Sequence, residues 1–155
     1  MRCFLSQETP HIMSIKRIRN YLLLAPKAPM TESLILLAAR VIFGFLFMSH
    51  GVAKWIMFKD VSETFYDPIG MGATLSFWLV LFAEILCSFG VILGALFRLS
   101  LIPMIFSMCV AVFIFHGGHP LNVVEPAMMY LTIFVLMFFS GPGEFSVDRI
   151  IMKLS

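Results

Sequence analysis

The sequence predicts an all-α membrane protein, a bundle of four transmembrane helices with both termini in the cytoplasm. Hydrophobic residues make up 60% of the 155-residue chain and charged residues only 13%, whereas soluble domains have about 45–50% and about 25%. The apolar residues gather in four continuous runs, and Lys and Arg collect on one side of them. The net charge of +2 and the lack of a basic run interleaved with aromatic residues exclude nucleic acid as a partner and favour membrane lipid.

The four apolar runs are expected to be helices at residues 33–50, 74–97, 99–115 and 126–140. Helices of about 20 residues match the hydrocarbon thickness of a bilayer. The runs lack the alternation of barrel strands, and a helix satisfies its own backbone groups in lipid. We therefore expect a transmembrane domain at 33–143, preceded by a cytoplasmic arm at 1–32 and followed by an interfacial tail at 144–155.

The orientation follows from the Lys and Arg residues beside the spans, which are enriched on the cytoplasmic side of membrane proteins. The side that holds both termini and the turn between the second and third spans has eight of them. The other side has two, Lys54 and Lys59. This bias predicts that both termini are cytoplasmic.

The connections carry recognisable helix start and stop signals. A tight hairpin is expected at residues 97–100, where Ser100 would cap the third helix. Pro126 is expected to open the fourth helix, and Gly141-Pro142-Gly143 to end it. Beyond this stop, Ser146 is expected to cap a short amphipathic helix that lies on the membrane surface.

Glu84 lies in the middle of the second expected span, where an ionised carboxylate costs about 2.5–3.5 kcal/mol. Arg40 is the only basic residue inside any expected span, so we predict that the two form a buried polar pair. Small residues near both charges would allow close packing of the first two helices. The pair is interpreted either as a proton or quinone-headgroup site or as a structural ion pair that sets helix register.

A second polar group is predicted at the outer mouth of the bundle, where the first, third and fourth spans end. Its members are His50, Lys54, His116, His119 and Glu125. Histidines on facing helices can bind haem or a transition metal. In His116-x-x-His119, however, Gly117-Gly118 separates the two residues, so they do not share one helical face. We therefore assign no metal site here, and a polar headgroup or substrate pocket is the stronger interpretation.

The placed residues together form a pattern that resembles the DoxX family of small four-helix bacterial inner-membrane proteins. The resemblance covers about residues 33–150 and departs from the family at Ile69-Gly70-Met71, where a G-x-P turn is common, and in the long N-terminal arm. The matching elements are Arg40, His50-Gly51-x-x-Lys54, Glu84, Gly94-x-x-x-Arg98, Glu125-x-x-x-x-Tyr130 and Gly141-Pro142-Gly143-x-x-Ser146-x-Asp148.

The resemblance implies a multi-pass protein of the bacterial inner membrane. Some members of the family resemble subunits of thiosulfate- or quinol-linked oxidoreductases, and others associate with oxidative-stress and thiol-homeostasis partners. The leading hypothesis is a subunit or accessory of a quinone-linked redox system, with a quinol-sized cleft between the first, second and fourth helices and with quinone as the candidate cofactor. A proton-coupled or small-solute carrier, built as a homo-oligomer, and a structural scaffold without activity remain as alternatives.

Overall fold

The computed structural model describes residues 29–154. Residues 1–28 of the expected cytoplasmic arm therefore lie outside the described residues. Four long helices are present in the described part. They are α2 (Met30–Ile56), the continuous helix of α4 (Ala73–Leu81), η1 (Phe82–Cys87) and α5 (Ser88–Leu93), the continuous helix of α6 (Phe97–Val110) and η2 (Ala111–Phe115), and α7 (Leu121–Ser140). Two short helices, α3 (Phe58–Val61) and α8 (Val147–Leu154), complete the described chain.

The prediction of four membrane-spanning helices is confirmed, because each long helix has the length and apolar composition to cross a bilayer. The protein is a multi-pass membrane protein whose outer helix faces contact lipid. Two boundaries differ from the sequence-based expectation. The first helix continues past His50 to Ile56, which places Lys54 in its last turn. The fourth helix begins at Leu121 rather than Pro126, because Pro120 already supplies the extended residue that precedes a helix.

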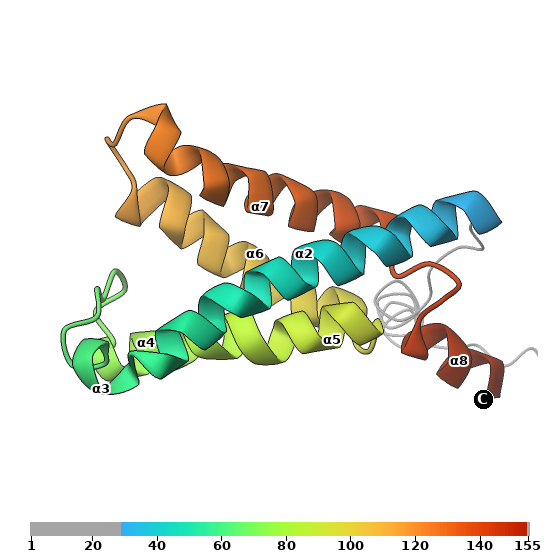
Figure 1. The fold of residues 1–155 in the computed structure, drawn as a ribbon, viewed down its shortest axis with the longest axis horizontal. Helices are drawn as coiled ribbons and strands as arrows, with labels where there is room; N and C mark the ends of the chain where they lie inside the picture. The colour runs from blue at the N-terminus through green and yellow to red at the C-terminus, as the bar shows by residue number, and fades with distance from the viewer. Residues whose placement is uncertain (1–28, 155) are drawn as a thin grey trace, which may run out of the picture.

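The four long helices form two pairs. Figure 1 shows α2 lying along α4 and α5, while α6 runs beside α7. The pairs converge where α8, the start of α2 and the turn between α5 and α6 lie, which we call the closed end. They diverge toward α3 and the start of α7, which we call the open end. The start of the described chain and α8 thus lie at the same end of the bundle.

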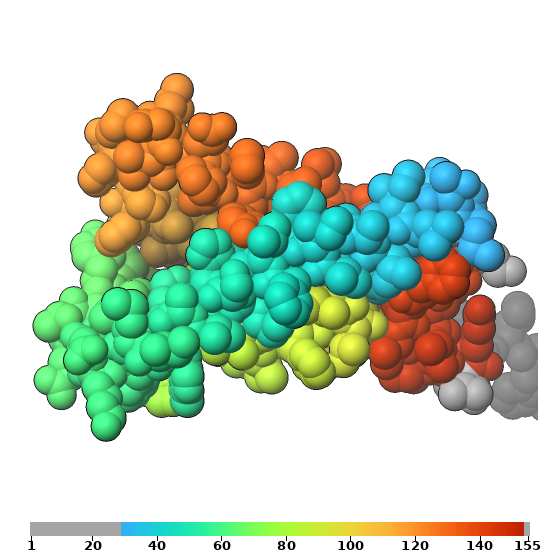
Figure 2. All heavy atoms as spheres, in the orientation of Figure 1, coloured from blue at the N-terminus to red at the C-terminus, as the bar shows by residue number. Residues whose placement is uncertain are grey.

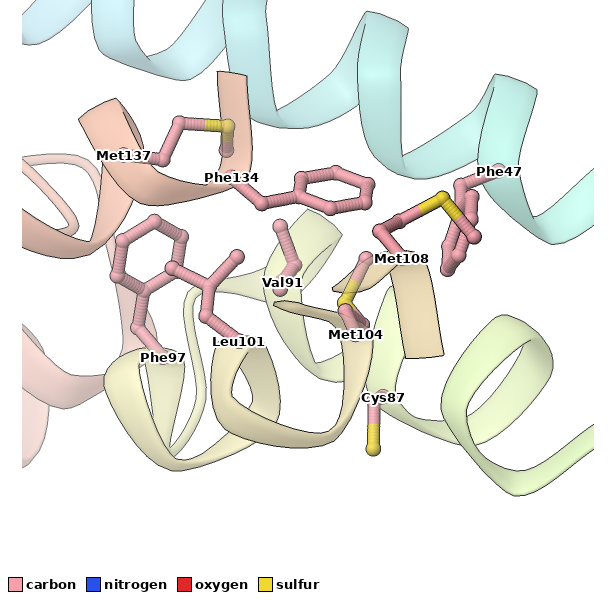
Figure 3. Packing of buried hydrophobic residues seen from close by; sticks show 9 residues of the cluster. All are labelled: Phe47, Cys87, Val91, Phe97, Leu101, Met104, Met108, Phe134 and Met137. Atoms are coloured by element: carbon pink, nitrogen blue, oxygen red, sulfur yellow. The ribbon is translucent and has the colours of Figure 1, made fainter. Parts of the chain in front are cut away.

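The hydrophobic core occupies the region where the two pairs meet. Phe47 of α2 packs edge-on against Phe134 of α7, with ring centroids 4.9 Å apart. Met104 and Leu101 of α6 fill the space beneath these rings and are fully buried (Figure 3). In water, burying apolar surface stabilises a protein by about 25 cal/mol per Å². Inside a bilayer this term does not drive helix association, because lipid tails are as apolar as the side chains, so close packing of these side chains carries the stability.

Small residues bring α2 close to the second span, as the sequence predicted. A Cβ added at Gly51 would lie 2.8 Å from the Glu84 Cβ and 2.7 Å from the Ile85 Cγ1. A Cβ at Gly44 would lie 2.7 Å from the Ile92 Cγ1. All three distances are shorter than side chains tolerate, so only glycine permits this approach.

The turn between the second and third spans lies at Gly94–Leu96 rather than at residues 97–100. Gly94 and Leu96 both have left-handed backbone conformations, with φ of 68° and 46°. Ser100 lies inside α6 and does not cap it, because α6 begins at Phe97. The cap comes from α8 instead: the Asp148 carboxylate accepts hydrogen bonds from the backbone N–H of Leu96 at 2.8 Å and of Phe97 at 2.9 Å.

The cap predicted for α8 is confirmed. The backbone N–H of Arg149 donates to the Ser146 hydroxyl at 3.2 Å, as an N-cap residue requires. The Asp148 N–H also donates to the Gly94 carbonyl at 3.0 Å. These bonds attach α8 to the closed end of the bundle.

Candidate functional site: a cavity at the open end

The structure does not bring Arg40 and Glu84 together, which corrects the predicted pair. Gly51 is the α2 residue that lies against Glu84. It follows Arg40 by eleven positions, which corresponds to roughly 16 Å of helix rise. An arginine side chain is too short to cover that distance, so the two charged groups lie in different parts of the bundle.

Arg40 belongs to the closed end. Its side chain is 1% exposed, and its Nη2 donates to the Phe145 carbonyl at 2.5 Å. The guanidinium carbon lies 5.8 Å from the centre of the Phe97 ring, and the negative charge of Asp148 interacts favourably with it. It also lies directly against Gly94, where a Cβ would collide with it. Arg40 therefore ties α2 to the segment that leads into α8.

Arg98 strengthens the same end. Its Nε donates to the Phe138 carbonyl at 3.0 Å and its Nη2 to the Phe139 carbonyl at 3.5 Å. These carbonyls belong to the last turn of α7, where cations are favourable partners. The matching residues Arg40, Gly94, Arg98, Ser146 and Asp148 thus meet at the closed end and hold the helices together.

Glu84 belongs to a different site, nearer the open end. Its side chain is almost completely buried, and its Oε1 forms an ion pair with the Lys54 Nζ. Its Oε2 is buried without a hydrogen-bond partner among residues 29–154. Lys54 reaches the carboxylate because it lies one turn beyond Gly51 on the same face of α2. The ion pair joins two residues that the sequence analysis had assigned to separate groups.

Tyr130 of α7 completes this polar group. Its hydroxyl lies 3.4 Å from the His50 Nε2, and the two rings meet edge-on with centroids 5.8 Å apart. The Tyr130 ring packs against Phe47 and Phe134, which hold it in place. The sequence analysis did not propose Tyr130 as a site residue. Two signals were available: its place in the family pattern, five residues after Glu125, and its position one turn before Phe134 on α7.

These side chains line a cavity of about 780 Å³ between the two helix pairs. All four spans contribute to its wall, including the third, which the predicted cleft had omitted. The wall is mainly apolar, and its charged or titratable groups are Glu84, Lys54, His50, Tyr130, His116 and Tyr66. In Figure 2 the surface of the third span lies set back between the orange α7 and the green segment of α2 and α3.

The predicted outer-mouth cluster is only partly brought together. His50, Lys54 and His116 line the cavity, whereas His119 and Glu125 do not. The His116 and His119 rings contact each other with centroids 5.9 Å apart, and Glu125 is exposed within α7. Among the described residues, no group of three His, Cys, Asp or Glu side chains lies close enough to hold a metal ion.

Two π-helical segments border the cavity from neighbouring spans. The segment η1 contains Glu84, and η2 contributes Ala111 and Phe115 to the wall. A π-helical turn inserts an extra residue into a helix and is frequent at functional sites. Here the insertions coincide with the part of each helix where the two pairs separate.

The loop at residues 62–72 borders the cavity at the open end. It contacts the third span through Tyr66, whose ring lies 5.3 Å from that of Phe115. Asp67 holds the loop in shape, since its carboxylate accepts hydrogen bonds from the Ser76 hydroxyl at 2.8 Å and from the backbone N–H of Gly72 at 2.6 Å. These two hydrogen bonds lower the pKa of Asp67.

We expect the loop to loosen when Asp67 loses its charge. Because the pKa of Asp67 is lowered in the folded protein, its contribution is present above the ordinary value and is lost as pH falls through the lowered one. In Asp67→Asn at neutral pH, the amides of Gly70, Met71 and Gly72 should exchange with deuterium faster than in the wild type. Asp60→Asn, an exposed change on α3, is the control. Equal exchange in both variants would contradict this role.

A family model described as DoxX matches residues 35–117, just over half of the chain. No curated protein and no solved structure matches. The matched segment contains Arg40, His50, Lys54, Glu84 and Arg98, and therefore includes residues of both the closed end and the cavity. The chain belongs to the DoxX family and is a four-helix, multi-pass membrane member of it.

Proposed function

We propose that this protein binds a membrane quinone or quinol in the cavity and acts as a subunit or accessory of a quinone-linked oxidoreductase system. The observation that carries the proposal is the Glu84 carboxylate, which has one oxygen paired with Lys54 and the other buried without a partner. A buried acceptor without a hydrogen bond is costly, so a ligand that donates one is favoured there. A quinol hydroxyl is such a donor.

The remaining groups of the cavity also suit this ligand class. Lys54, and the Tyr130 hydroxyl beside His50, offer hydrogen-bond donors to the carbonyl oxygens of an oxidised quinone. The apolar wall accommodates the ring and the isoprenoid tail. The volume of about 780 Å³ falls within the range of small-molecule sites, about 300–1,000 Å³.

The chemistry divides between this chain and a partner. Oxidation of a quinol to a quinone removes two protons and two electrons. Glu84 and His50 are groups at the cavity that can accept protons, and His50 is exposed and can pass them to water. The electrons pass to a flavin or metal centre of a partner oxidoreductase.

The proposal includes the membrane in which the protein lies and its orientation there. The Lys and Arg bias supports an orientation with both termini in the cytoplasm, and membership of the DoxX family supports the bacterial inner membrane. In this orientation the closed end faces the cytoplasm and the cavity opens toward the other side. A redox partner, or further copies of the chain, would complete the assembly.

The test is quinone retention by the full-length protein. Protein purified from its native membrane in mild detergent should carry quinone, detected by chromatography and mass spectrometry of the organic extract. Glu84→Ala should bind added quinol, kept reduced during the titration, roughly tenfold more weakly than the wild type, because the quinol hydroxyl donates to the carboxylate and a hydrogen bond to a charged group contributes about 1.5–3 kcal/mol. Glu125→Ala, an acidic residue outside the cavity, should bind like the wild type. A wild-type protein that neither retains nor binds quinone would overturn the proposal.

A carrier is the second candidate, favoured by one observation. The cavity lies between two helix pairs that converge at the closed end and diverge toward the open end, a geometry that allows one pair to rock against the other. In this case Glu84 would be the protonatable site. Proton-coupled solute uptake into liposomes, abolished by Glu84→Gln, would support the carrier over the redox subunit. Neither uptake nor quinone binding would leave a structural scaffold.

A further inference from the structure

We infer that the ligand enters sideways from the bilayer, between the second and third spans, and keeps its apolar tail there while its headgroup lies against α2 and α7. The inference rests on the proposed function and extends it to the tail of the ligand. It specifies a long-tailed quinone rather than a water-soluble one.

The first observation is that the cavity wall is chemically asymmetric. The hydrogen-bonding groups His50 and Lys54 come from α2, and Tyr130 comes from α7. Glu84 faces α2 across the Gly51 contact. The opposite part of the wall comes from the second and third spans. It consists mainly of apolar side chains, such as Leu79, Val80, Phe82, Phe106 and Val110. A headgroup and an apolar tail therefore have separate surfaces to occupy.

The second observation is that the apolar part of the wall reaches the outside of the bundle. Leu79, Phe82 and Phe106 line the cavity, yet they are 45%, 46% and 58% exposed. Residues that belong both to a cavity and to the outer surface mark an opening. We call this opening, bordered by Leu79, Phe82 and Phe106, the side portal.

The depth of the side portal shows what it opens onto. Phe106 is the central residue of the third span, Phe97–Phe115, and Phe82 lies near the middle of the second, Ala73–Leu93. The middle of a membrane span faces the hydrocarbon core of the bilayer. A molecule that enters through the side portal must already be dissolved in lipid, so small hydrophilic solutes cannot use this route.

The water-facing route is narrowed by the loop at the open end. Phe65 packs on Phe77 of α4 with ring centroids 5.1 Å apart, and Tyr66 packs on Phe115 of η2. The loop thus contacts the second and third spans, one from each helix pair, beyond the side portal. The tail of the ligand can therefore reach lipid directly through the side portal. Its headgroup would lie at the other side of the cavity, beside the polar groups and the exposed His50.

The inference is tested with benzoquinones that share one headgroup and differ in tail. The full-length protein in nanodiscs is titrated with a tailless form and with a long isoprenoid form, and affinity is expressed per mole fraction in lipid. Ser107→Trp places a bulky ring in the cavity wall next to Phe106. Ile114→Trp, on the same span but outside the cavity, is the matched control, and Leu79→Trp repeats the obstruction from the other side.

The expected result is that Ser107→Trp and Leu79→Trp weaken binding of the long-tailed quinone at least tenfold. Binding of the tailless quinone should change less than twofold, and Ile114→Trp should leave both unchanged. Glu84→Ala should weaken binding of both compounds in their reduced, quinol forms, because the headgroup hydroxyl donates to the Glu84 carboxylate. Variants are compared only after thermal unfolding shows that they fold like the wild type.

The failures are distinguishable. If the obstructed variants bind both quinones normally, or lose both equally, the side portal is wrong while quinone binding stands. If the wild type prefers the tailless quinone, the tail surface is wrong. If the wild type binds neither and retains a phospholipid instead, the proposed function fails, and with it the assignment of the tail to a quinone.

Discussion

Replacing Lys54 with methionine is expected to destabilise the protein by about 2–3 kcal/mol, because it leaves the Glu84 carboxylate buried without its cation. The loss should be smaller than the 3–5 kcal/mol of a fully buried pair, since the Lys54 side chain is 35% exposed. Adding Glu84→Gln to Lys54→Met should recover most of the stability, because the remaining amide carries no charge. Thermal unfolding in detergent, followed by size-exclusion chromatography, measures both steps.

The double-mutant comparison contains its own control. Residues that interact directly give non-additive losses, whereas separate residues give additive ones. We expect Lys54 and Glu84 to be coupled, and Arg40→Ala and Glu84→Ala to be additive, because Arg40 contacts Phe145 and Phe97 at the closed end. Additive losses for Lys54 and Glu84 would show that their ion pair contributes nothing to stability.

Replacing Asp148 with alanine is expected to cost about 3 kcal/mol, the sum of two hydrogen bonds to an ionised group of about 1.5 kcal/mol each. The Asp148 carboxylate is 7% exposed and accepts from the first backbone N–H groups of α6. Its removal leaves these donors without a cap and removes a negative charge near Arg40. The α5–α6 turn should then hold α8 less firmly.

Asp148→Asn should lose about half as much stability as Asp148→Ala. The amide keeps one acceptor oxygen, so one of the two charge-assisted hydrogen bonds is replaced by a neutral hydrogen bond. Asp60→Ala on α3 is the matched control, since Asp60 is exposed and should change the unfolding temperature little. The same detergent melting experiment reports all three variants. An Asp148→Ala protein that melts like the wild type would show that α8 is attached by its other contacts alone.

The roles of the two clusters differ, and so do the consequences of changing them. Arg40, Arg98 and Asp148 bond to backbone groups of other elements, so their loss should reduce folding rather than ligand affinity. Glu84 and Tyr130 border the cavity, so their loss should reduce affinity in a protein that still folds. Residues that the family pattern presents as one series therefore separate into a group that joins the helices at the closed end and a group that borders the cavity.

The sequence by itself determined the number of spans and the burial of Arg40 and Glu84, whereas the burial of Arg98 and Asp148 follows from the tertiary structure. Apolar runs of suitable length have one stable solution in lipid, the helix, so their number follows directly from composition. Arg40 and Glu84 are buried because both lie among residues that face protein, as their positions beside small residues indicated. The amphipathic α8 and its Ser146 cap also follow from local pattern alone.

Only the tertiary structure decided which groups meet. Helical periodicity specifies which face of a helix a residue occupies, but it does not specify how far one helix slides along its neighbour. The contacts of Arg40 with Gly94 and of Gly51 with Glu84 set that displacement. They place Lys54, rather than Arg40, opposite the buried carboxylate. The cavity likewise depends on the divergence of two helix pairs, a relation among distant segments that no local pattern contains.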